Sequence, residues 1–200
     1  MGAWAIGRLH GRTSRRVNKR SPVPLQRYIA LLRAINVGGH VVKMDRLRAV
    51  FEALRFRRVE TFIASGNVLF DSPELDTAAL EQMIEKRLEK ELGYEVATFL
   101  RTPSELAAIV SSLPFGDADL AGCILSVAFL KHLPSTESTG RLHSLRTKTD
   151  DLLVRERELY WRCRGSTMES KIWRTPLEKV IGMPATFRNI TTVRKLAAKC

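Results

Sequence analysis

The spacing of hydrophobic and polar residues predicts three strands within residues 28–71. Residues 28–35 form a short apolar run of strand length, closed by a polar, glycine-rich turn signal. Residues 59–65 and 68–71 are rich in strand-forming side chains and are separated by Gly66-Asn67, a pair that favours a tight hairpin turn. The sequence therefore predicts one strand followed, further along, by a hairpin.

Helical patterns lie between and after these strands. Apolar residues recur every three or four positions from Met44 and again over 80–92, where Gly93 marks the end of a long amphipathic helix. Residues 94–101 return to a strand pattern. The predicted order is β-α-β-β-α-β, which is the split βαβ or ferredoxin-like arrangement.

The second half predicts the same order with additional helices. Thr102-Pro103-Ser104-Glu105 combines an N-cap, a first-turn proline and a capping-box glutamate, and begins a connecting helix. Thr175-Pro176-Leu177-Glu178 repeats this helix start. The other predicted elements are a strand at 124–130, a helix at 135–145, strands at 152–155 and 159–162, a helix end at Gly182, a strand at 185–187 and a last helix containing Val193 and Leu196.

We therefore predict an α+β protein with two ferredoxin-like subdomains and flanking helices. The expected boundaries are a disordered basic tail at 1–27, a first subdomain at 28–101, and a connecting helix with the second subdomain at 102–200. At 200 residues, the chain is long enough for two small domains. No residue-level repeat between the halves is visible in the sequence.

Charge is distributed unevenly along the chain. The formal net charge is +12, but residues 45–154 carry 13 Lys or Arg against 17 acids, so an acidic middle lies between two basic ends. Residues 1–27 carry seven of the positive charges and no acid. This tail is interpreted as an extension without a role, a nucleic-acid or membrane-surface arm, or a targeting peptide.

Cysteine content and hydropathy predict the compartment. The three cysteines, Cys123, Cys163 and Cys200, are far apart in the sequence and form no close pair typical of a disulfide framework or a zinc site. No segment has the length of apolar sequence that a membrane span requires, and the start lacks the apolar region of a secretory signal. These observations predict a soluble, cytoplasmic protein without a metal site.

Four separated motifs resemble a known family. They are YIALLRAINVGG at 28–39, SGNVLF at 65–70, Pro114-Phe115, and ATFRNITTVRKL at 185–196. In this order they resemble the domain of unknown function 1697 family, which implies two ferredoxin-like subdomains and names no biochemical activity. The sequence departs from the family pattern at Ala34 and at Ile190-Thr191.

A first candidate site is predicted where the loop after the first strand meets the hairpin turn. The two ends lie at the same edge of a split βαβ sheet, and glycines there leave backbone N–H groups free to bind an anion beside a lysine. The alternative is that these glycines only shape the turns. The predicted ligand-binding residues are Asn36, Gly38, Gly39, Lys43, Ser65 and Asn67.

A second candidate site is predicted before the last helix. Arg188-Asn189 precedes the helix start, where free N–H groups and a guanidinium suit a phosphate or carboxylate, although Asn189 also fits a plain N-cap. Lys171 lies in a basic, polar stretch, and Arg33 follows the first strand. We include both as candidate ligand-binding residues.

The sequence lacks the motifs of the common enzyme classes. It contains no P-loop, no dinucleotide-binding glycine pattern, no H-E-x-x-H and no C-x-x-C, so no reaction and no cofactor is indicated. Trp161 and Trp173 are interpreted as packing aromatics. A small anionic ligand is the favoured partner, with nucleic acid and a protein-interaction scaffold as alternatives; nothing in the sequence specifies an oligomer.

Overall fold

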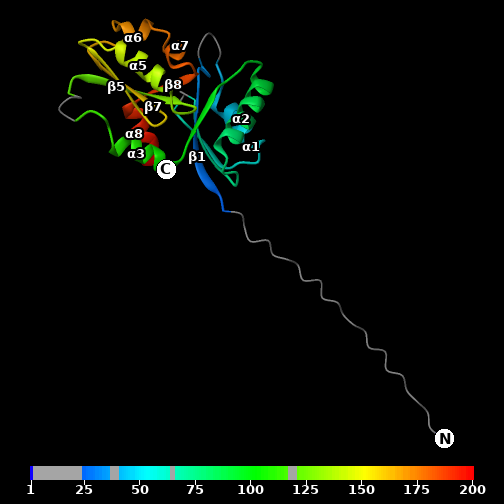
Figure 1. Cartoon of the computed structure of the whole chain (residues 1–200). Helices are drawn as coiled ribbons and strands as arrows, with labels where there is room; N and C mark the ends of the chain where they lie inside the picture. The colour runs from blue at the N-terminus through cyan, green and yellow to red at the C-terminus, as the bar shows by residue number, and fades with distance from the viewer. Residues whose placement is uncertain (2–23, 37–40, 64–65, 117–120) are drawn as a thin grey trace.

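The computed structural model describes residues 1, 24–36, 41–63, 66–116 and 121–200, which form two four-stranded antiparallel sheets with helices (Figure 1). The first sheet has the strand order β2-β3-β1-β4 and the second sheet has the order β6-β7-β5-β8. The strands are β1 (Gln26–Leu32), β2 (Arg57–Phe62), β3 (Asn67–Ser72), β4 (Thr98–Arg101), β5 (Cys123–Leu130), β6 (Asp150–Arg155), β7 (Glu158–Arg164) and β8 (Ala185–Asn189).

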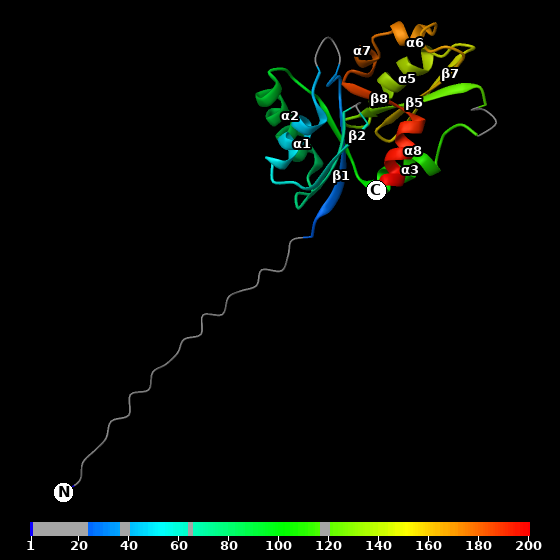
Figure 2. The same ribbon diagram turned by 180° about the vertical axis from the view of Figure 1, so that it is seen from behind.

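Helices cover the outer face of each sheet and also lie between the two halves. In Figures 1 and 2, α1 and α2 flank the first sheet, α5, α6 and α7 flank the second, and α3 and α8 lie side by side. Among the described residues, no helix is long and apolar enough to cross a bilayer. The helices are α1 (Met44–Glu52), α2 (Thr77–Leu92), α3 (Pro103–Ser111), α5 (Thr136–Ser144), α6 (Lys171–Arg174), α7 (Leu177–Ile181) and α8 (Ile190–Lys199).

The buried side chains form three cores. An outer core lies between the first sheet and α1 and α2, another lies between the second sheet and α5, α6 and α7, and a middle core joins the two sheets with α3 and α8. Strand β1 contributes to two of them, because Tyr28 and Ala30 enter the outer core whereas Ile29 and Leu31 enter the middle core. Burial on both faces explains why residues 28–32 of this strand are an uninterrupted apolar run.

The strand register makes the two halves equivalent, residue by residue. Leu32 of β1 pairs with Thr98 of β4, and Leu130 of β5 pairs with Ala185 of β8. Likewise, β3 pairs with β1 as β7 pairs with β5. The duplication is therefore a match of structural positions, which few shared side chains reveal in the sequence.

The predicted helix boundaries at Gly93, Thr102 and Gly182 are confirmed, and the one at Thr175 is wrong. Gly93 caps α2 in the left-handed conformation, with φ of 82°, and Thr102 forms the full capping box of α3. Thr175, in contrast, follows α6, and Pro176 occupies the N-cap position of α7 without a side-chain hydrogen bond. Residues 175–178 do not form a second capping box, because the Glu178 side chain accepts from the Ala185 backbone N–H and not from the N-cap residue.

The predicted hairpin turn is displaced by one residue. Asn67 pairs with Phe62 and with Leu31, so it is the first residue of β3 and not part of the turn. Gly66 precedes it with φ of 73°, the left-handed conformation that glycine adopts without strain. Asn67 is consequently buried inside the sheet, and its amide nitrogen donates to the Phe62 carbonyl at 3.0 Å.

Candidate functional site

A pocket opens between the second sheet and the short helices α6 and α7. Its volume is about 630 Å³, which lies in the range of small-molecule sites. Most of its lining is aromatic or aliphatic. The lining residues are Arg33, Ser126, Trp161, Ile172, Trp173, Thr175, Pro176, Leu177, Glu178, Lys179, Ala185 and Phe187. We call this space the α6–α7 pocket.

The pocket exists because the two halves differ in one connection. Between β3 and β4 the chain forms the 16-residue helix α2, whereas between β7 and β8 it forms only α6 and α7, of four and five residues. Two short helices cover less of a sheet than one long helix. Part of the outer face of the second sheet therefore stays uncovered.

Side chains at equivalent positions of the two sheets show the same difference. Tyr28 of β1 is buried against Phe70, but the position equivalent to Tyr28 in β5 holds the small Ser126. Leu100 is fully buried in β4, whereas its equivalent in β8, Phe187, is 36% exposed. The smaller side chain of Ser126 and the shorter helices α6 and α7 together leave a hollow on the second sheet.

A buried carboxylate fixes the floor and one wall of the pocket. Asp150 accepts hydrogen bonds through Oδ1 from Trp161 Nε1 at 2.8 Å and from Ser170 Oγ at 2.7 Å. Burial opposes ionisation of Asp150, but these two donors, together with the hydroxyls of Thr147 and Thr149 on Oδ2, outweigh it and lower its pKa. Since Ser170 also caps α6, the same group orients the Trp161 indole and the start of the helix that carries Trp173.

The polar side of the pocket is an ion pair between the two halves. Arg33, just after β1, donates through Nε and Nη2 to the two carboxylate oxygens of Glu178 at 2.6 and 2.7 Å. Glu178 Oε1 also accepts from the backbone N–H of Ala185 at 3.0 Å. Lys179 stands next to this pair and is exposed. An apolar cavity with cationic groups on one side suits an apolar ligand that carries an anion.

Two predicted site residues lie at this place. Arg33 lines the pocket, and Lys171 is the first residue of α6, directly before the lining residues Ile172 and Trp173. Lys171 is exposed. Of these two predicted residues, Arg33 therefore belongs to the pocket lining, and Lys171 precedes the lining residues in α6.

Arg188 and Asn67 meet each other in the interior. Arg188 Nε donates to Asn67 Oδ1 at 2.7 Å, and its Nη2 donates to the carbonyls of Leu32 and Gly66 at 3.0 and 3.3 Å. Burial lowers the pKa of Arg188 to about 10. The guanidinium therefore points between the sheets and not towards the start of α8, where the sequence pattern placed it.

An equivalent arginine holds the opposite side of the contact between the halves. Arg101 Nε donates to Glu158 Oε1 at 2.7 Å, and its Nη2 donates to the carbonyls of Leu130 and Arg157, both at 3.0 Å. Arg101 occupies the position in β4 that Arg188 occupies in β8. We call these two arrangements the Arg101 clamp and the Arg188 clamp.

Three of the other predicted residues, Asn36, Lys43 and Asn189, lie in the described part of the chain. Asn36 Oδ1 accepts from the Val42 backbone N–H at 2.8 Å, and Lys43 is an exposed residue at the N-cap position of α1. Asn189 caps α8 by accepting from the Thr191 backbone N–H at 2.8 Å. Gly38, Gly39 and Ser65 lie outside the described residues.

Sequence reasoning missed most of the α6–α7 pocket. Trp161 is buried as expected, but Trp173 is 63% exposed, so the interpretation of Trp173 as a packing aromatic is wrong. The reason is that the preceding residue, Ile172, takes the buried side of the one-turn helix α6, and adjacent residues of a helix point in different directions. The signal in the sequence was the Thr175-Pro176 break, which divides a connection that is one helix in the first half.

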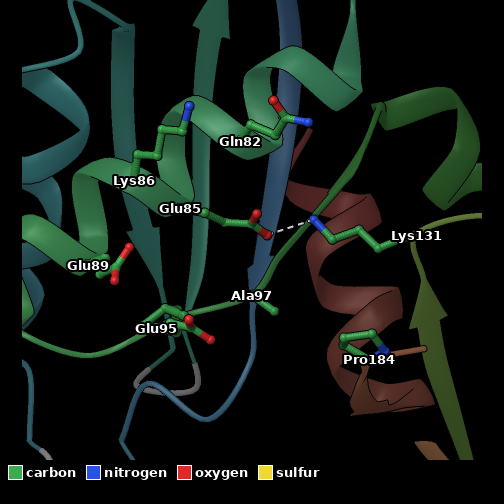
Figure 3. Close-up of a pocket in the computed structure, with 9 residues that line it drawn as sticks. Gln82, Glu85, Lys86, Glu89, Glu95, Ala97, Lys131 and Pro184 are labelled. Atoms are coloured by element: carbon green, nitrogen blue, oxygen red, sulfur yellow. Dashed lines mark hydrogen bonds and ion pairs between the residues drawn. The ribbon is translucent and has the colours of Figure 1, made fainter. Parts of the chain in front are cut away.

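A second cavity, of about 370 Å³, is drawn in Figure 3. Lys131 reaches across from the second half and pairs with Glu85 at 2.7 Å and Glu81 at 2.9 Å. These carboxylates also accept from the backbone N–H groups of Thr98 and Leu100 at 2.7 and 2.8 Å, so they satisfy the edge strand β4. This cluster therefore stabilises the fold, and its glutamates disfavour an anion.

Two antiparallel sheets covered by helices place this protein in the α+β class, as predicted. A family model described as protein of unknown function (DUF1697) matches residues 25–160, and the chain belongs to this family. A conserved bacterial protein, SP0830 from Streptococcus pneumoniae, has a similar structure, with a TM-score of 0.72 and 24% sequence identity over 88% of this chain and 98% of the other. No curated protein matches significantly. The family predicted from the four sequence motifs is confirmed.

Proposed function

We propose that the protein binds a small ligand with an apolar body and an anionic group in the α6–α7 pocket. The observation that carries this proposal is the combination of two tryptophans, Trp161 and Trp173, with Arg33 at one cavity of about 630 Å³. Aromatic walls bind the body of a ligand by excluding water, and a guanidinium fixes an anion. The proposed ligand is still a small anion, as the sequence predicts, but its proposed site is the α6–α7 pocket.

Charge around the pocket supports an anionic ligand. Lys171, Arg174 and Lys179 are exposed on α6 and α7, and residues 155–200 carry 11 basic residues against four acids. A positive surface raises the local concentration of anions and accelerates their association.

The nucleic-acid alternative has less support. Ferredoxin-like modules that bind unpaired strands receive the bases on an open sheet face with stacking aromatics. Here the inner faces of the two sheets are packed into the middle core, where Leu31 and Phe99 meet Val127 and Phe129. A pocket for one small molecule is the better fit to the surface that remains open.

We also propose the finer classification of the fold. The order β2-β3-β1-β4, with antiparallel neighbours, supports a ferredoxin-like assignment of 28–101, and β6-β7-β5-β8 supports the same assignment of 102–200. β1 begins at Gln26, two residues before the proposed boundary with the basic segment 1–27.

Filling the pocket tests the proposed site. The substitution Ser126→Tyr introduces the side chain that occupies the equivalent position in the first half, and it should occupy the hollow beside Trp161. We expect the full chain to enhance the fluorescence of 1-anilinonaphthalene-8-sulfonate, an apolar anion, and the Ser126→Tyr variant to lose that enhancement.

A matched control separates pocket filling from a general effect of tyrosine. Ser144 lies on α5, is exposed and does not line the pocket, so Ser144→Tyr should leave the fluorescence unchanged. Urea unfolding of both variants checks that the fold is retained. Equal fluorescence enhancement in wild type and Ser126→Tyr would overturn the proposed site.

A further inference from the structure

The ion pair at the edge of the α6–α7 pocket has the geometry of a carboxylate receptor whose position is already taken. Arg33 presents the Nε and Nη2 side of its guanidinium, and Glu178 accepts from it with one oxygen on each nitrogen, at 2.6 and 2.7 Å. We propose that the ligand class is an amphipathic monocarboxylate, and that its carboxylate replaces Glu178 on Arg33. This inference rests on the proposed ligand site in the same pocket.

Replacement of Glu178 by a ligand carboxylate on Arg33 costs little free energy, because the Arg33–Glu178 ion pair is partly solvated. The side chains of Arg33 and Glu178 are 43% and 35% exposed, and ion pairs of this kind contribute little net stability. A ligand whose apolar body is buried can therefore compete for Arg33 with a carboxylate of the same shape.

Glu178 has a second partner that holds it after Arg33 leaves. Its Oε1 accepts from the Ala185 backbone N–H at 3.0 Å, at the start of β8. Arg33 is likewise anchored through its backbone, since its N–H donates to the Ala97 carbonyl at 2.9 Å. Only the outer part of the Arg33 side chain needs to turn from Glu178 to the ligand.

The same arrangement favours a single negative charge. Glu178 stays within the pocket lining, so a phosphate dianion meets more repulsion than a carboxylate does. The apolar part of the ligand would lie along Trp173, Leu177 and Phe187, which line the cavity beside the pair. A flat or chain-like carboxylic acid matches both features.

Three probes with one naphthyl body test the ligand class by isothermal titration calorimetry on the full chain. The probes are 1-naphthylacetate, its neutral analogue 1-naphthaleneacetamide, and 1-naphthyl phosphate. We expect the acetate to bind most tightly. Arg33→Gln should weaken acetate binding about ten-fold or more, as for loss of a charge-assisted hydrogen bond, and should leave acetamide binding unchanged.

Glu178→Gln provides the opposite expectation. Glutamine keeps an acceptor for the Ala185 N–H but releases the charged competitor, so acetate should bind about two- to five-fold more tightly. In the double variant Arg33→Gln/Glu178→Gln this gain should disappear, because it acts through Arg33. A gain that persists in the double variant indicates general repulsion by Glu178 and overturns the exchange.

The outcomes separate this inference from the proposed function. If acetate and acetamide bind wild type equally and Ser126→Tyr abolishes both, the pocket stands and the carboxylate selection is overturned. Tighter binding of the phosphate also overturns the monocarboxylate class. If no probe binds wild type, the proposed function fails and this inference fails with it.

Discussion

Two buried arginines fix the halves to each other at equivalent positions but with chemically different partners. Arg101 faces the carboxylate of Glu158, whereas Arg188 faces the neutral amide of Asn67. Burial lowers the pKa of Arg101 and raises the pKa of Glu158, so desolvation outweighs their mutual attraction. The Arg188 clamp shows that a neutral oxygen acceptor at this position is compatible with the fold.

The neutral partner of Arg188 leads to a prediction for Glu158. Glu158→Gln should lower the free energy of unfolding by only about 1–2 kcal/mol, because an amide oxygen can still accept from Arg101 Nε. Glu158→Ala should cost about 3–5 kcal/mol, because it leaves a buried cation without that partner. Urea denaturation of both variants measures the difference, and equal losses would contradict the argument.

The raised pKa of Glu158 predicts a pH dependence. Between the ordinary pKa of 4.5 and the higher value in the folded protein, the folded state binds more protons than the unfolded state. The contribution of Glu158 to stability therefore falls as the pH rises through this window. The free energy of unfolding of wild type, relative to Glu158→Gln, should decrease from pH 4.5 upwards and then level off; a relative increase would reverse the sign of the shift.

At the scale of elements, tight connections decide where the sheets and helices meet. Gly66 ends the β2–β3 turn against the loop after β1, and its carbonyl accepts from the Leu32 N–H at 2.8 Å. A Cβ atom at Gly66 would lie 2.7 Å from Ile35 Cγ2 and 3.2 Å from Leu32 Cβ. Gly93 has a similar positive φ, but a Cβ there would meet nothing within 4 Å.

These two glycines form a matched pair for mutation. Gly93→Ala should cost about 1 kcal/mol, the strain of a side chain in the left-handed conformation. Gly66→Ala should cost about 1–3 kcal/mol more, because the methyl group also overlaps buried side chains. Thermal and urea unfolding give both values; a cost at Gly93 equal to that at Gly66 would show that packing at the turn is unimportant.

The order of elements could be predicted because its signals are local. Apolar spacing located β1, α1 and α2, and the Thr102 capping box marked the start of α3, since each depends on neighbouring residues in the chain. Arg188 was placed beside a helix start because Asn189 next to it is an N-cap. Alternation along β8 turns Arg188 to the inner face, and the partners that it meets there in the other half lie over a hundred residues away.

The pocket could not be predicted for a related reason. It depends on what fails to cover the second sheet, and a short connection is informative only when compared with the longer one in the other half. Ser126 carries no functional signal by itself; it gains meaning because its structural equivalent is Tyr28. That equivalence follows from strand register, which single-sequence patterns do not give.

At the scale of the whole molecule, the middle core joins both halves into one unit of packing. Ile29 and Leu31 of β1 share it with Val127 and Phe129 of β5, and α3 packs on α8. Neither half can separate without exposing this apolar surface and breaking the two arginine clamps. The halves are therefore expected to unfold together.

Hydrogen exchange tests this cooperativity. Amides of β1 and β5 should exchange with the same free energy of opening, equal to that of global unfolding. Phe129→Ala should lower both values together, by about 3–5 kcal/mol, although it removes a side chain from only one half. Mass spectrometry resolves the two strands, and loss of protection confined to β5 would show that the halves open independently.

The equivalence of the halves also makes the order of the chain interchangeable. Lys199, at the end of α8, pairs with Glu60 at 2.8 Å, and Glu60 pairs with Arg27 at the start of β1, also at 2.8 Å. The end of the last helix, α8, thus lies beside the first strand, β1. In the other half, the equivalent helix α3 is joined by the chain to the equivalent strand β5. A circularly permuted chain that begins at β5 and runs from α8 into β1 would preserve the cores, the clamps and the pocket.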